Sequence, residues 1–167
     1  MMHSKTNTKS KWQPNITVAA IIEHETKFLI VTDDTRHGLK LNQPAGHIEE
    51  NEDILAAVIR EVKEETSLDF TPTAIVGIYL YKLPSNQTYL RFCFTGNVSS
   101  SNINNPHPIY GDDGVVAANW LTLDTIKARI KEHRTPFVMR CLNDYLANKR
   151  FSLDLISQYT DLSGITK

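Results

Sequence analysis

Three glutamates crowd one short stretch of the chain, the segment REVKEE at residues 60–65. Glu61 and Glu65 are four residues apart, so in a helix their side chains are neighbours on one face. A like-charge pair at that spacing destabilises a helix by roughly 0.2–0.5 kcal/mol. A cation bound between the carboxylates would remove the repulsion, and the spacing therefore raises the hypothesis of a metal site.

The residues around these glutamates predict an amphipathic helix. We expect it to start near Glu52 or Asp53, with Asn51 as N-cap and acidic residues in the first turn, and to end near Ser67. With about 100° per residue and Glu61 at zero, apolar residues fall between about 20° and 160°. Those residues are Ile54, Val58, Val62, Leu55 and Ile59. Glu65 falls at about 40°, inside the edge of this stripe.

Two interpretations of the glutamates follow from the residues alone. A solvated charged face is the usual meaning of a charge run, and it accounts for Lys63, which points away from the stripe. It accounts poorly for Glu65, because an ionised carboxylate at a buried edge needs a partner. Mg²⁺ is a hard cation that takes oxygen ligands, so it fits such a cluster.

The composition predicts one globular domain. The chain has 167 residues, 41% of them apolar and 22% charged. The formal net charge of −1 gives no general attraction to nucleic acid or to an anionic membrane. A phosphate-bearing ligand would therefore need local cations or metal ions.

Other features of the sequence indicate a cytoplasmic protein. Cys93 and Cys141 show no metal-ligand spacing, and we expect reduced thiols. The polar N-terminal residues contain no apolar segment of a secretory signal. No run approaches the ~20 apolar residues that span a bilayer. We expect residues 1–14 to be a disordered tail, and residues 15–160 to form a single domain.

The pattern along the chain predicts an α/β (α+β) fold, with a mixed β-sheet and helices on both faces. We expect residues 16–22 and 27–31 to form a hairpin, followed by a short extended piece before the first helix. The later expected strands are residues 74–83, 88–98 and 115–121. The later expected helices are residues 123–132 and 137–149, and the second of them is opened by Pro136 at its first position.

The sequence GHIEENEDILAAVIREVKEETSL, which begins at Gly46, resembles the Nudix box. That pattern is Gly, five residues, Glu, seven residues, Arg-Glu-aliphatic-any-Glu-Glu, one residue, Gly and an aliphatic residue. The matching residues are Gly46, Glu52, Arg60, Glu61, Val62, Glu64, Glu65 and Leu68. Ser67 departs from the pattern, which has glycine there. Serine in a left-handed cap costs roughly 1–2 kcal/mol, unless the helix ends differently.

The resemblance extends beyond the box. Residues 42–47 (NQPAGH), 88–92 (TYLRF) and 135–137 (TPF) resemble the NudJ-type phosphatases of the MutT-like Nudix hydrolases. The resemblance implies an α/β/α sandwich. It also implies hydrolysis of the phosphoanhydride of nucleoside di- and triphosphates or of related pyrimidine diphosphates, with Mg²⁺ as cofactor and Mn²⁺ as a possible substitute.

By resemblance, the metal ligands are Glu61, Glu64, Glu65 and the carbonyl of Gly46. Glu64 is our candidate for the base that deprotonates the attacking water. Arg60, counted with Glu61 and Glu64 among the catalytic residues, is expected to orient the carboxylates, with Glu52 as its partner. For these last two residues, an ordinary surface ion pair is the alternative.

Substrate contacts are expected from Arg36, Gln43, His47 and Arg91. For Arg36 and Arg91, and likewise for Lys40, the alternative is a solvated basic side chain. For Gln43 and Asn42 the alternative is capping of a strand end. For His47 it is an ordinary surface histidine. Asp112 and Asp113 form either a turn or, as the resemblance implies, a further acidic metal ligand or base. Trp120 is expected in the core.

Other functions on the same fold remain open at this level. One alternative is a catalytically silent Nudix-like module that binds a nucleotide; the presence of all four box glutamates argues against it. Another is an isomerase of prenyl diphosphates, which would require a cysteine such as Cys93 beside an apolar pocket. The expected partner is a small nucleotide or pyrimidine diphosphate, with no nucleic acid and no membrane. The sequence indicates no oligomeric state.

Overall fold

Within the described part of the chain, two four-stranded sheets and three α-helices make up the fold. A computed structural model describes residues 12–109 and 114–158. The strands are β1 (Asn15–Ile21), β2 (Glu23–His24), β3 (Lys27–Thr35), β4 (Gly38–Asn42), β5 (Ala45–His47), β6 (Asp69–Lys82), β7 (Thr88–Ser99) and β8 (Val115–Thr122). The helices are α1 (Ile54–Thr66), α2 (Leu123–Ala128) and α3 (Phe137–Leu146), with 3-10 turns at Ile130–Glu132 and Leu153–Leu155.

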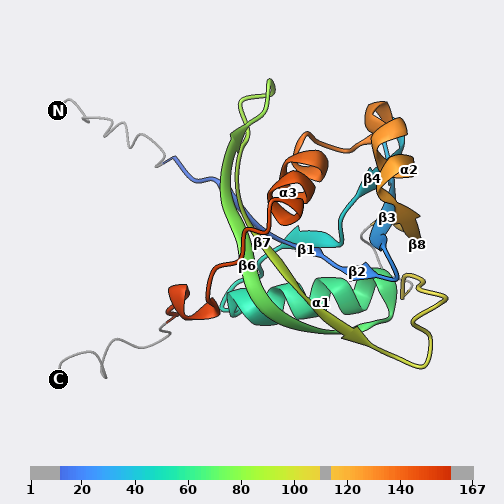
Figure 1. Cartoon of the computed structure of the whole chain (residues 1–167). Coiled ribbons are helices and arrows are strands. Elements are labelled where there is room, and N and C mark those ends of the chain that lie inside the picture. The colour runs from blue at the N-terminus through green and yellow to red at the C-terminus, as the bar shows by residue number, and fades with distance from the viewer. Residues whose placement is uncertain (1–11, 110–113, 159–167) are drawn as a thin grey trace, which may run out of the picture.

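The first sheet is mixed, as predicted. Its strand order is β5-β1-β7-β6, with β1 parallel to β7 and the other neighbours antiparallel. The second sheet joins β2, β3 and β4, and β8 pairs with the other side of β3. Figure 1 shows the first sheet running between α1 and α3.

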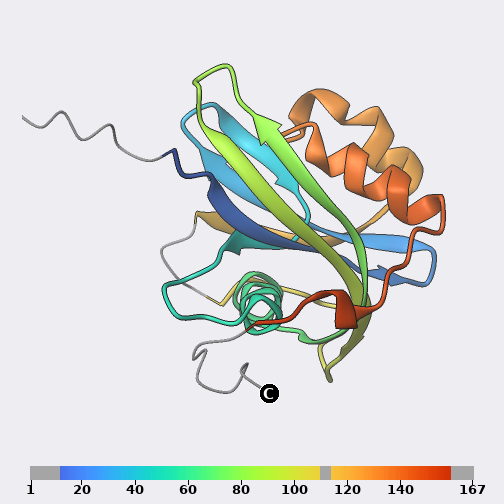
Figure 2. The ribbon, with the colours of Figure 1, turned by 90° about the vertical axis from the view of Figure 1, so that its left-hand side faces the viewer.

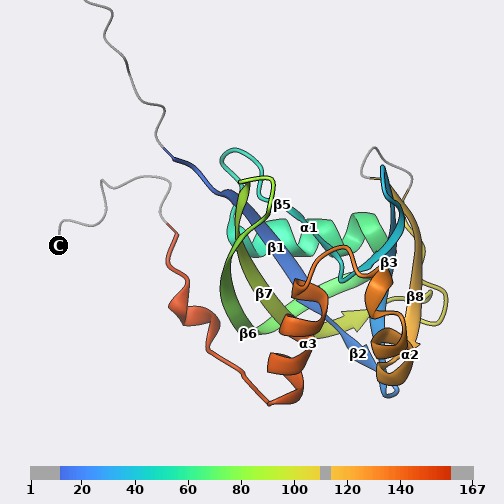
Figure 3. The same ribbon diagram turned by 90° about the horizontal axis from the view of Figure 1, so that it is seen from above.

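Helices cover both faces of the β5-β1-β7-β6 sheet. Alternate residues of β1 point to opposite faces: Val18 packs with Val58 and Val62 of α1, whereas Ala19 packs with Val138 and its neighbours in α3. Figure 2 shows α1 end-on at one face, with the other helices across the sheet. In Figures 1 and 3, α2 and α3 lie near each other. The expected α/β/α sandwich is confirmed.

Helix α1 begins at Ile54, one or two residues after the predicted start. Asp53 is its N-cap, with Oδ1 accepting from the Leu55 amide at 2.8 Å. The predicted cap, Asn51, instead has a positive φ of 64° in the preceding loop, and the first turn contains no acidic residue. The buried face includes Val58 and Val62, but Ile59 is 40% exposed, because it lies at the far edge of the predicted stripe.

Ser67 ends α1 in the left-handed conformation that the box pattern assigns to glycine. Its φ is 61°, and its amide donates to the Lys63 carbonyl at 2.9 Å. The hydroxyl donates to the carbonyl of His107 at 2.7 Å, and Lys63 Nζ donates to the Ser67 carbonyl at 3.3 Å. These bonds hold a conformation that is intrinsically unfavourable for serine.

The predicted pairing of residues 16–22 with residues 27–31 in a hairpin is wrong. The turn does form, with positive φ at Glu25 and Thr26, but it joins only β2 to β3. β1 instead pairs with β5 and β7, because its alternating buried residues complete the core on both faces of that sheet. Strands distant in sequence decide the pairing of β1, so the nearby turn did not predict it.

Two smaller differences concern the C-terminal half. The helix predicted over residues 123–132 breaks after Ala128 into a 3-10 turn, and α3 ends at Leu146. Trp120 packs against the core but is only partly buried, and its indole nitrogen donates to the Ile103 carbonyl at 2.6 Å. None of the helices in the described ranges has the length and apolar character needed to cross a bilayer.

The end of α1 yields a stability prediction. Ser67→Ala removes the hydroxyl bond but keeps a Cβ at positive φ, whereas Ser67→Gly also removes the steric strain. We expect the glycine variant to exceed the alanine variant by about 1 kcal/mol in unfolding free energy, or about 2–4 °C in Tm. Thermal melts followed by circular dichroism test this. Equal Tm values for the two variants would mean that the left-handed cap carries no strain.

Candidate active site

A cavity of about 1140 Å³ opens beside α1 and the short edge strand β5. Its wall combines residues of α1, β5, the β3–β4 hairpin, β7 and the loop before α3. Of the predicted site residues, eight line it: Arg36, Gly46, His47, Arg60, Glu61, Glu64, Glu65 and Arg91. The fold therefore brings most of the predicted site into one place.

Arg60 organises the acidic wall of this cavity. Its Nε and Nη2 donate to the two carboxylate oxygens of Glu52 at 2.7 and 2.9 Å. Its Nη1 donates to both Glu61 Oε1, at 2.9 Å, and Glu64 Oε2, at 3.0 Å. Nη2 also donates to the His47 carbonyl at 3.0 Å. One guanidinium thus fixes three carboxylates and the backbone beside Gly46.

The electrostatics agree with this geometry. The hydrogen bonds from Arg60 hold the pKa of Glu52 below its usual range. The same bonds, followed by the charge of Glu61, raise the pKa of Arg60 above its ordinary value. Arg60 is only about a quarter exposed, so the network is more than a solvated surface pair. The predicted orienting role of Arg60 and its pairing with Glu52 have the required contacts.

Glu65 and Glu61 meet the β5 strand directly. Glu65 is 4% exposed, and its Oε2 accepts from the Ala45 amide at 2.8 Å. Glu61 is 5% exposed and lies against Gly46, where an added Cβ would overlap its carboxylate. Both residues are carboxylates at the buried edge of α1, as the helical wheel predicted. Glu64 is more open, with 42% of its side chain exposed.

The expected substrate contacts fall at different depths. Arg36 is exposed on the β3–β4 hairpin, while Arg91 is buried in the floor on β7. Burial, followed by the charges of Arg134 and Arg91, lowers the pKa of His47. Gln43 is buried, and its Nε2 donates to the Val138 carbonyl at 2.7 Å, which favours the structural alternative for that residue. Asp112 and Asp113 lie outside the described residues.

One cavity residue, Arg134, has no local sequence pattern that predicts its place in the site. It lies in the loop before α3, and its Nη1 donates to the carboxylate of Asp33 at 2.7 Å. Asp33 is on β3 and buried. The two residues are 101 positions apart, so no local pattern links them.

The residues of the acidic wall fit a divalent metal in chemistry. All proposed donors are oxygens, which suits Mg²⁺ or Mn²⁺, and the missing side chain of Gly46 lets the backbone approach Glu61. Within residues 12–109 and 114–158, no three acidic, histidine or cysteine side chains are already arranged as a ligand set. Glu61 and Glu64 instead share Arg60 Nη1, so metal binding would require their carboxylates to turn from that nitrogen.

The comparisons with known proteins identify the fold and the box together. A family model described as the NUDIX domain matches residues 11–141. The chain belongs to the NUDIX family. It is 30% identical over 149 residues to the phosphatase NudJ of Escherichia coli (strain K12), with 89% of this chain and 94% of that protein covered. The enzyme class is therefore the predicted one, a hydrolase acting on phosphoanhydrides.

Solved structures share the architecture. A NUDIX hydrolase from Nitrosomonas europaea is 46% identical, has a TM-score of 0.81, and matches over 88% of this chain and 98% of its own. A bifunctional NMN adenylyltransferase/ADP ribose pyrophosphatase from Francisella tularensis, solved with AMP and a manganese ion, is 19% identical with a TM-score of 0.61. It matches over 84% of this chain and 43% of its own. NUDIX hydrolases generally use divalent metals.

Gly46 provides a test of the acidic wall. In Gly46→Ala the new methyl group would displace the Glu61 carboxylate, which is the flexible end of its side chain. We expect phosphohydrolase activity to fall by about tenfold or more, by analogy with the loss of outer-shell support at metal sites, while Tm changes little. Activity against nucleotides and thermal melts are the measurements. Unchanged activity would mean that Glu61 need not lie against the glycine.

Proposed function

We propose that this NUDIX hydrolase is Mg²⁺-dependent and cleaves the phosphoanhydride of nucleoside di- or triphosphates or of related pyrimidine diphosphates. The observation that carries the proposal is the Arg60 network: one guanidinium gathers three box glutamates beside Gly46 at the wall of a large cavity. The NudJ-type subfamily resemblance supports the substrate class. A polyanionic substrate suits the basic side chains across the cavity, which include Lys40, Arg91 and Arg134.

In this proposal the oxygens of Glu61, Glu64 and Glu65 and the Gly46 carbonyl would hold Mg²⁺, and Mn²⁺ would be able to replace it. The ion would polarise a phosphoryl oxygen and lower the pKa of a bound water. Glu64 is the general base, because it is the most exposed of the three carboxylates and can reach a water molecule. Arg60 is a positioning residue, and Arg36 and His47 contact the substrate.

Two alternatives are weaker on the present geometry. A silent nucleotide-binding module would have no need for the four box glutamates, yet all are present and three are bound to one arginine. A prenyl diphosphate isomerase would need a reactive cysteine in the cavity. Cys93 is instead fully buried in the core with Val138 and Cys141, and burial raises its pKa. The cytoplasmic location stays a prediction.

Metal removal tests the cofactor. We expect EDTA to abolish hydrolysis, and Mg²⁺ or Mn²⁺ to restore it. The assay should score phosphate and pyrophosphate separately across nucleotides, nucleotide sugars, dinucleoside polyphosphates and pyrimidine diphosphates. That panel also identifies the substrate. Full turnover in EDTA would contradict metal dependence.

A Glu64 variant tests the base. Glu64→Gln keeps the size and the hydrogen bond from Arg60 but removes the basic oxygen. We expect the turnover number to fall by about 10²–10⁴-fold, with Tm nearly unchanged because the side chain is half exposed. Glu132→Gln is a matched control, since that glutamate lies in an exposed pair with Arg129. A Glu64→Gln enzyme with wild-type turnover would assign the base elsewhere.

A further inference from the structure

A row of polar residues crosses the floor of the cavity on three neighbouring strands. His47 of β5 lies opposite Thr17 of β1, and Thr17 lies opposite Arg91 of β7. Adjacent strands are separated by about 4.8 Å. Two residues further along, Ala19 and Cys93 pack beneath α3, so the Thr17 and Arg91 side chains face the same side of the sheet.

Arg91 is the unusual member of this row. It is only 7% exposed, and its Nε and Nη1 find no hydrogen-bond acceptor among the described residues. Its guanidinium lies 5.0 Å from the ring centroid of Phe137 at the start of α3. Burial lowers the pKa of Arg91. A buried arginine remains charged, and leaving such a group without an acceptor is unfavourable.

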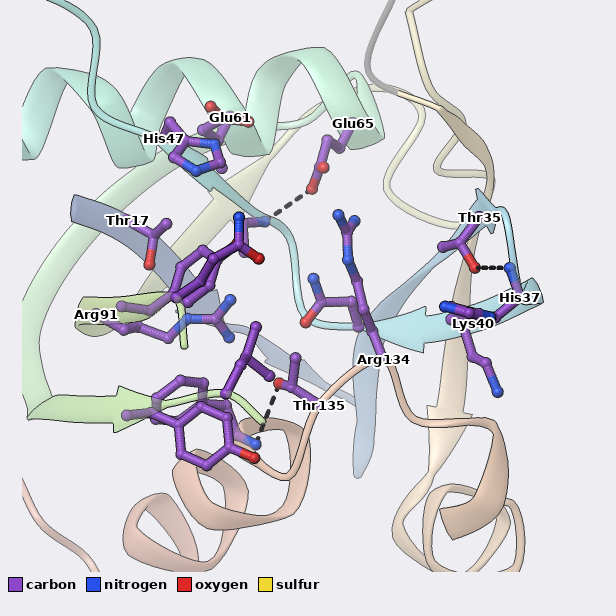
Figure 4. Close-up of a pocket in the computed structure, with 18 of the residues that line it drawn as sticks. Thr17, Thr35, His37, Lys40, His47, Glu61, Glu65, Arg91, Arg134 and Thr135 are labelled. Atoms are coloured by element: carbon purple, nitrogen blue, oxygen red, sulfur yellow. Dashed lines mark hydrogen bonds between the residues drawn. The ribbon is translucent and has the colours of Figure 1, made fainter. Parts of the chain in front are cut away.

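Arg134 adds a second cation on this side of the cavity. Arg134 Nη1 donates to the Asp33 carboxylate, and the Arg134 backbone amide donates to the Leu41 carbonyl at 2.9 Å. These two bonds fix the position of the Arg134 side chain. After burial, the positive charge of Arg134 also lowers the pKa of both Arg91 and His47. Figure 4 shows Glu61 and Glu65 on α1 at one side of the cavity, with Arg91 and Arg134 across from them, nearer α3.

We propose that Arg91, supported by Arg134, is a metal-independent receptor for a phosphate group of the substrate, separate from the phosphate at the acidic wall. The proposal rests on the proposed function for its substrate and deepens it. An anion would supply the missing acceptors of Arg91 and would screen the repulsion between two arginines. A neutral heterocycle would supply acceptors but would leave this repulsion in place.

The Thr17 side chain belongs to the same receptor. It lines the cavity and is buried, and its Oγ1 finds no hydrogen-bond partner in the described part of the chain. A hydroxyl can donate to a phosphate oxygen. Thr17 also lies next to Arg91 in the strand register, so one phosphate group can meet both residues.

Binding without metal tests the receptor directly. The probe is inorganic pyrophosphate in EDTA, measured by calorimetry and by the rise in Tm. We expect the wild type to bind and Arg91→Met to bind at least tenfold more weakly, while Arg91→Lys is intermediate because lysine keeps charge but not the planar fork. Arg129→Met is the matched control, since Arg129 lies in the exposed Glu132 pair away from the cavity, and it should bind as wild type does.

Stability separates this role from a structural one. Arg91→Met replaces a buried cation, whose Nε and Nη1 lack acceptors, by an apolar side chain of similar length, so we expect the free variant to melt at or above the wild-type Tm. A structural arginine would instead give a lower Tm. Equal pyrophosphate affinity in wild type and Arg91→Met, or a large Tm loss that Arg91→Lys restores without restoring binding, would overturn the proposal.

Kinetics distinguish a substrate phosphate from a released one. With a substrate found in the panel, Arg91→Met should raise KM about tenfold or more and leave kcat within a few-fold, because the lost contact is made equally before and during the reaction. Weaker inhibition by inorganic phosphate with an unchanged KM would overturn the assignment to substrate. The calorimetry does not need turnover, so failure of the proposed activity would not be confused with failure of the receptor.

Discussion

The fork of hydrogen bonds from Arg60 is the contact on which the site depends. Without a cation, Glu61 and Glu64 would repel each other across one turn of α1. Arg60 Nη1 lies between them, while Nε and Nη2 are held by Glu52 from the loop that precedes the helix. The bond to the His47 carbonyl carries the same network across to β5. Loop, helix and edge strand are therefore fixed to one another by a single side chain.

The same network stabilises the short edge strand β5. β5 contains only Ala45–His47, and an unpaired strand edge exposes backbone groups that need partners. Glu65 accepts from the Ala45 amide, and Arg60 donates to the His47 carbonyl. Gly46 lies between these two bonds, where a side chain would overlap Glu61. The side chains that we propose for the chemistry thus also close the edge of the sheet.

The cavity has walls of opposite charge, and the packing of the sheet explains why. α1 covers one face and presents its acidic edge beside β5, whereas α3 covers only part of the other face. Beyond Phe137, the floor residues of β1 and β7 open into the cavity, and Arg134 enters from the loop before α3. A metal-bound polyphosphate matches such a division, because it carries cations on one side and free anionic oxygens on the other.

Local patterns in the sequence were sufficient to predict many features of this molecule. The wheel placed Glu65 and Glu61 at the buried edge of α1, and both are buried there, because helix geometry converts spacing into position with little outside help. The box spacing also identified the pairing of Arg60 with Glu52, a contact within one loop and one helix. The strands from Ala74 onward were found by their apolar, β-branched and aromatic content, although their ends shifted.

Only the tertiary structure decided the features that depend on distant partners. β1 pairs with β5 and β7 rather than with β3, since burial on both faces outweighs a nearby turn. Asn51 gave way to Asp53 as the cap because loop conformation, and not residue type alone, selects it. The Asp33–Arg134 pair and the buried guanidinium of Arg91 arise where strands and loops far apart in sequence meet. Sequence spacing fixes which face of a helix a residue occupies, but what lies across from that face is set by the packing of the whole chain.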